Sequence, residues 1–161
     1  MLMTLKGLKD EDFVNYKKPS MFLIFPYCSF KCGRAECQNS ALAEEQLKKV
    51  TILSLIENYS CFPLTEAVVC GGLEPMDSWE DLQAFIMSFR YHFADDIVIY
   101  TGYTEEEIQD KIEWLSLYEN IIIKFGRYIP NQEHHFDELL GVELVSPNQY
   151  AKAYNVMEGY C

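Results

Sequence analysis

Three cysteines in one short segment are the residues of this chain that are best suited to chemistry. Cys28, Cys32 and Cys37 lie within ten residues of one another. The start of the chain turns acidic before an export signal could form. Clustered cysteines without such a signal indicate metal or redox chemistry rather than a disulfide framework. The other cysteines are isolated, and Cys61 and Cys70 are expected to behave as small hydrophobic residues in apolar surroundings.

The spacing of the three cysteines permits two kinds of metal site. Three thiolates on one loop can hold three corners of a cubane iron–sulfur cluster and leave the fourth iron open to a further ligand. A structural zinc site needs a fourth protein ligand, which His134 or His135 could supply. Three thiols without a metal are the least favoured alternative, because clustered exposed thiols oxidise readily. The pattern therefore favours iron–sulfur and keeps zinc as the alternative.

Short apolar segments alternate with helical patterns along the chain. Strands are expected at 21–25, 67–70, 97–100 and 121–125, with a further short strand at 142–145. Helices are expected at about 41–59, from Ser78 onward, and from a Thr104–Glu107 capping box to about Leu117. The first four strands are continuously apolar, as in the buried strands of a parallel sheet with helices on its faces. The sequence thus predicts an α/β fold with a small parallel sheet.

The ends of the expected strands gather the candidate residues at one edge. The cysteine segment follows the first strand, Gly71 and Gly72 end the second, and Thr101 and Gly102 follow the third. In open parallel sheets, ligands bind outside the carboxyl ends of the strands. This convergence is the strongest physical argument for a site, although a plain strand-end turn remains an alternative for each segment after the first.

The order of these motifs resembles the radical S-adenosylmethionine family. A strand precedes Cys-x-x-x-Cys and a third cysteine, and Gly-Gly-Leu-Glu-Pro follows the second strand at 71–75. The small size of the chain and the segments at 100–104, 126–128 and 146–149 are similar to the activating proteins of anaerobic ribonucleotide reductases. The resemblance covers about 21–149. It implies a partial (β/α) barrel that forms a single cluster-binding domain over 1–161.

The resemblance also implies an activity. The three cysteines would hold a 4Fe–4S cluster whose open iron is chelated by S-adenosyl-L-methionine. Reductive cleavage would yield a 5′-deoxyadenosyl radical, which takes a hydrogen atom from a glycine of a partner glycyl-radical enzyme, such as an anaerobic ribonucleotide reductase. Flavodoxin or ferredoxin would donate the electron. Glu74 would bind the methionine ammonium, Gly71 and Gly72 would approach the ligand, and Thr101 and Gly102 would line the adenosine.

Two insertions separate this chain from the family pattern. Four residues lie between Cys32 and Cys37 where the family has two, and Leu73 interrupts the Gly-Gly-Glu-Pro motif. A non-catalytic iron–sulfur module for redox or sensing is therefore a second hypothesis, and a zinc-stabilised interaction domain is a third.

One further motif near the end of the chain has two readings. Ser146, Asn148 and Gln149 could contact ligand or partner, or could simply form a turn initiated by Ser-Pro.

The overall charge excludes one class of partner. The formal net charge is −12, from 13 basic and 25 acidic residues, and the basic residues are scattered. A nucleic-acid backbone would be repelled by such a chain. No apolar run approaches the roughly 20 residues that cross a bilayer. The sequence predicts a cytoplasmic protein without a nucleic-acid or membrane partner.

Overall fold

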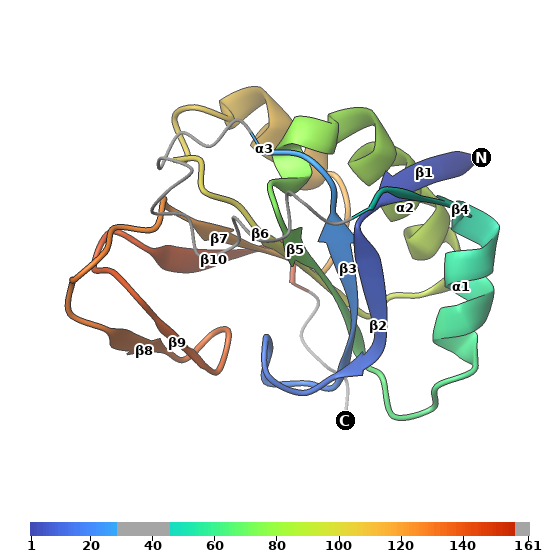
Figure 1. Ribbon diagram of the computed structural model, residues 1–161, viewed down its shortest axis with the longest axis horizontal. Coiled ribbons are helices and arrows are strands. Elements are labelled where there is room, and N and C mark those ends of the chain that lie inside the picture. The colour runs from blue at the N-terminus through green and yellow to red at the C-terminus, as the bar shows by residue number, and fades with distance from the viewer. Residues whose placement is uncertain (29–45, 157–161) are drawn as a thin grey trace.

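A six-stranded sheet is the centre of the molecule, in the order β10-β7-β6-β5-β3-β2 (Figure 1). The computed structural model describes residues 1–28 and 46–156. The strands of this sheet are β2 (Gly7–Asp12), β3 (Ser20–Phe25), β5 (Ala67–Gly72), β6 (Asp96–Tyr100), β7 (Ile121–Phe125) and β10 (Tyr150–Tyr154). The sheet is mixed, because β2 and β10 run antiparallel to their neighbours at the two edges.

The four central strands are the four apolar segments that the sequence predicts. β3, β5, β6 and β7 pair in parallel, and Leu23, Cys70, Ile99 and Ile123 follow one another across the sheet in register. Their carboxyl ends consequently meet at one edge. The edge strand β2 escapes prediction because four of its six residues are charged, and β10 escapes it because Tyr-Ala-Lys-Ala-Tyr contains no continuous apolar run. The expectation of a partial barrel of the radical S-adenosylmethionine type stays a prediction.

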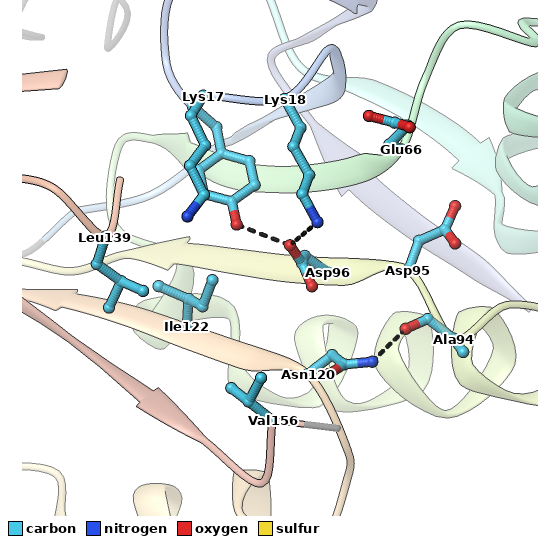
Figure 2. Close-up of a pocket in the computed structure, with 11 residues that line it drawn as sticks. Lys17, Lys18, Glu66, Ala94, Asp95, Asp96, Asn120, Ile122, Leu139 and Val156 are labelled. Atoms are coloured by element: carbon cyan, nitrogen blue, oxygen red, sulfur yellow. Dashed lines mark hydrogen bonds and ion pairs between the residues drawn. The ribbon is translucent and has the colours of Figure 1, made fainter. Parts of the chain in front are cut away.

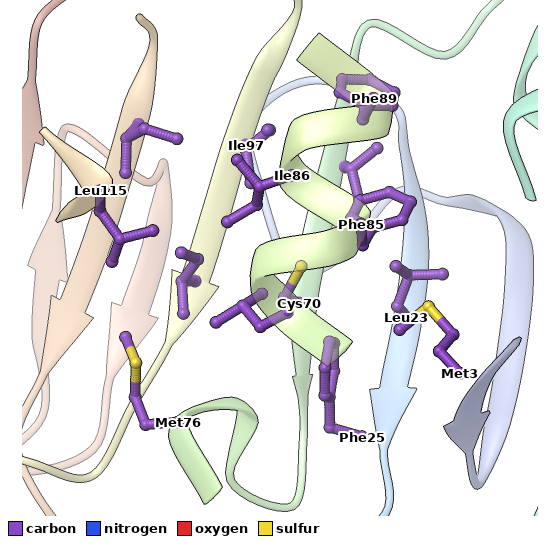
Figure 3. Close-up of a cluster of buried hydrophobic side chains, with 14 of the residues drawn as sticks. Met3, Leu23, Phe25, Cys70, Met76, Phe85, Ile86, Phe89, Ile97 and Leu115 are labelled. Carbon is purple, nitrogen blue, oxygen red and sulfur yellow. The ribbon is translucent and has the colours of Figure 1, made fainter. Parts of the chain in front are cut away.

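Three helices cover one face of the sheet. They are α1 (Ile52–Ser60), α2 (Trp79–His92) and α3 (Gln109–Leu115). Figure 3 shows α2 lying over the strands, with Phe85, Ile86 and Phe89 in the same buried cluster as Cys70 and Ile97. The sequence predicts helices on both faces, but every helix in the described part of the chain packs on this one. None of these helices is long and apolar enough to span a membrane.

The opposite face carries a smaller apolar cluster. It is built from Tyr16, Val69, Val98, Ile122 and Leu140, together with neighbouring residues. A hairpin of β8 (His135–Asp137) and β9 (Val142–Leu144) contributes to this cluster from a position beside the main sheet (Figure 1). The expected strand at 142–145 is therefore present as β9, but in a separate two-stranded sheet.

The predicted helix at 41–59 is wrong in its first half where the structure describes it. Lys48–Thr51 forms β4, which pairs antiparallel with β1 (Leu2–Leu5). The helix α1 begins at Ile52, and the hydroxyl of Thr51 caps it by accepting a hydrogen bond from the Ser54 N–H. The strand depends on pairing with the start of the chain, which local helical periodicity does not reveal. Residues 41–45 lie outside the described part.

The other two predicted helices are present: α2 begins directly after Ser78, as predicted, and α3 has shifted ends. A 3₁₀ turn, η2 (Pro75–Ser78), precedes α2, which starts directly after Ser78. The capping box is confirmed, since the Thr104 and Glu107 N–H groups each donate to the other side chain, at 3.1 and 3.3 Å. The regular helix α3 nevertheless starts only at Gln109 and ends at Leu115, two residues before the predicted end.

Substitution of Phe85 tests how much the packing of α2 on the sheet contributes to stability. Its side chain is fully buried and stacks on Phe89 at 5.6 Å between ring centroids. We expect Phe85→Ala to lower the free energy of unfolding by about 3–5 kcal/mol, through lost burial and the cavity left behind. Met87→Ala on the exposed side of α2 is the control and should change it by less than about 0.5 kcal/mol. Equal effects in denaturant titrations would contradict this packing.

Candidate iron–sulfur site at the carboxyl edge of the sheet

Cys28 lies three residues beyond the end of β3 and is partly exposed. Two backbone contacts hold the segment that leads to it. The Leu73 N–H donates to the Phe25 carbonyl at 3.4 Å, and the Glu74 N–H donates to the Tyr27 carbonyl at 2.7 Å. The cysteine segment therefore starts at the carboxyl edge of the sheet, against the residues that follow β5. Cys32 and Cys37 lie outside the described residues.

The Glu74 carboxylate joins the ends of β5 and β6. Its Oε1 accepts hydrogen bonds from the Thr101 hydroxyl at 2.9 Å and the Gly102 N–H at 2.7 Å. Its Oε2 accepts one from the Met76 N–H at 3.0 Å, which starts the 3₁₀ turn. The structure thus brings together Glu74, Thr101 and Gly102, three of the residues that the sequence singles out, next to the start of the cysteine segment.

Burial dominates the acid–base behaviour of Glu74. The residue is 6% exposed, and burial raises the pKa of the carboxyl group to about 7 against the opposing effect of its three hydrogen bonds. A carboxylate oxygen accepts two hydrogen bonds, so Oε2 retains capacity for one further donor. Glu74 is therefore fitted to bind an additional N–H group, although most of its hydrogen-bonding capacity is already used within the protein.

The glycines at the end of β5 are explained by packing. Gly72 pairs with Phe25 and has a positive φ of 84°, and a Cβ there would lie 2.6 Å from Ile24 Cγ2. A Cβ on Gly71 would lie 3.1 Å from the Phe22 ring. A strand-end turn therefore accounts for Gly72, and close packing on β3 accounts for Gly71, without reference to a ligand.

The turn before β10 closes the same edge beyond β7. The Asn148 side-chain amide donates to the Arg127 carbonyl at 2.9 Å, and the Gln149 amide donates to the Gly126 carbonyl at 3.3 Å. These contacts favour the turn alternative for Asn148 and Gln149. The Ser146 hydroxyl is buried and has no hydrogen-bond partner in the described part of the chain.

The two histidines considered for a zinc site, His134 and His135, lie at the start of the β8–β9 hairpin. His134 lies just before β8 and pairs with Glu143 of β9 at 2.6 Å. No group of three or more His, Cys, Asp or Glu residues suited to a metal occurs among residues 1–28 and 46–156.

The two isolated cysteines in the described part of the chain have different surroundings. Cys70 lies in the core as expected, and burial raises the pKa of its thiol. Cys61, in contrast to the expectation of apolar surroundings, is exposed just beyond α1.

A cavity of about 450 Å³ lies at the opposite, amino-terminal edge of the parallel strands (Figure 2). Asp96 at the start of β6 lines it, and accepts hydrogen bonds from the Tyr16 hydroxyl at 2.7 Å and the Lys18 ammonium at 2.9 Å. The cavity thus holds the Asp96–Lys18 ion pair and lies at the opposite end of the parallel strands from Cys28.

Sequence reasoning misses two residues at the carboxyl edge of the sheet, Tyr27 and Lys124. Tyr27 contacts Glu74 through its backbone carbonyl, and a backbone contact cannot be recognised from the residue type. Lys124 lies inside an otherwise apolar strand and donates to the carbonyls of Thr101 and Gly126 at 3.4 and 3.0 Å. A lysine within Ile-Ile-Ile-Lys-Phe is a signal that could have been used, because buried lysines are rare.

The structure is that of an α/β protein in which a cysteine segment starts at the carboxyl ends of parallel strands. A family model described as a 4Fe–4S single cluster domain matches residues 19–143. The chain belongs to this family, and the donor set of three closely spaced cysteines fits such a cluster. A search of curated proteins finds no match to the chain. Iron–sulfur is accordingly favoured over zinc.

We expect an added methyl group to be more destabilising at Gly72 than at Gly102. Gly72→Ala should lower the free energy of unfolding by about 1–3 kcal/mol, because alanine is strained at positive φ. It would also meet Ile24 at close range. Gly102→Ala should cost less than about 0.5 kcal/mol, since a Cβ there would lie 3.6 Å from its nearest neighbours. Thermal unfolding of both variants checks this contrast, and a larger loss for Gly102→Ala would refute it.

The ligand assignment predicts a loss of iron on substitution of the cysteine segment. Cys28→Ala, Cys32→Ala and Cys37→Ala should each reduce iron after anaerobic reconstitution from about four per chain to below about one. Cys61→Ala removes an exposed thiol elsewhere and should leave the iron content unchanged. Iron near four per chain in any of the three segment variants would show that the assignment is wrong.

Proposed function

We propose that the chain is a radical S-adenosylmethionine activating protein that installs a glycyl radical on a partner, most similar in role to the activators of anaerobic ribonucleoside-triphosphate reductases. The observation that carries the proposal is the hydrogen bonding of Glu74 to Thr101 and Gly102, beside the Tyr27 carbonyl. It joins three of the segments on which the resemblance rests. A cytoplasmic location is consistent with an electron donor such as flavodoxin or ferredoxin.

The residues of the edge have distinct tasks in this proposal. When bound and reduced, a 4Fe–4S cluster supplies the one electron that cleaves S-adenosyl-L-methionine into methionine and a 5′-deoxyadenosyl radical able to take a hydrogen atom from glycine. Glu74 Oε2 would accept a hydrogen bond from the methionine ammonium of the ligand, in addition to the hydrogen bond that it already accepts from the Met76 N–H. Gly102 leaves the space beside Glu74 and Arg127 free of a side chain, so that an adenosine can approach the backbone.

A second candidate is a cluster protein that does not cleave S-adenosylmethionine. One observation favours it: the Glu74 carboxylate already has three protein donors and is satisfied without a ligand. In that case the network would simply brace the edge that holds the cysteine segment, and the cluster would serve electron transfer or sensing.

Formation of 5′-deoxyadenosine separates the two candidates. Anaerobically reconstituted protein, reduced with dithionite and supplied with S-adenosyl-L-methionine, should produce 5′-deoxyadenosine and methionine in equal amounts. Glu74→Gln should lower the yield at least tenfold, because loss of a charged hydrogen bond costs about 1.5–3 kcal/mol. Glu80→Gln, at an exposed position at the start of α2, is the control.

The result against the activator is equally definite. Iron-loaded protein that makes no 5′-deoxyadenosine, even in the presence of a cognate glycyl-radical enzyme, would leave the non-catalytic cluster protein as the function.

A further inference from the structure

No further inference is drawn: the strongest candidate, the cavity of about 450 Å³ at the amino-terminal edge of the parallel strands, is lined by charged groups among which Asp96 already pairs with Tyr16 and Lys18, and nothing in the structure shows what ligand would fill it.

Discussion

The buried carboxylate of Glu74 is the contact on which the candidate site depends. It is nearly inaccessible to water, and hydrogen bonds from three protein groups compensate for its burial. Through its side chain it ties the residues after β5 to those after β6, and through its N–H it ties them to the end of the segment after β3. Removal of this carboxylate would leave the donors at two strand ends, after β5 and after β6, without their common acceptor.

The hydrophobic core explains why the strand ends can be held so closely. β3, β5, β6 and β7 are pinned in register by side chains buried beneath three helices, so their carboxyl ends cannot slide relative to one another. The polar contacts at the edge then need to fix only short segments. At the amino-terminal edge Asp96 pairs with Lys18, and at the carboxyl edge Glu74 accepts hydrogen bonds from Met76, Thr101 and Gly102.

The sequence predicts the parts of the fold whose signals are local. Continuous apolar runs identify the four parallel strands, and their order predicts that Cys28, Glu74 and Thr101 meet at one edge. Elements that depend on distant pairing escape this reasoning. The sequence of β4 resembles the start of a helix, and only its pairing with β1 makes it a strand; β10 contains no continuous apolar run, and its pairing with β7 identifies it. The roles of Cys32 and Cys37 rest on spacing and family membership.

The central claim is that the cysteine segment holds a 4Fe–4S cluster with one open iron at the edge that contains Glu74. Electron paramagnetic resonance of the dithionite-reduced protein, with and without S-adenosyl-L-methionine, tests it most directly. The account predicts a cubane signal that changes when the ligand is added, because its amino and carboxylate groups would occupy the open iron. A spectrum that is identical at saturating ligand would contradict the open iron, and a protein without any cluster signal after reconstitution would contradict the iron–sulfur site itself.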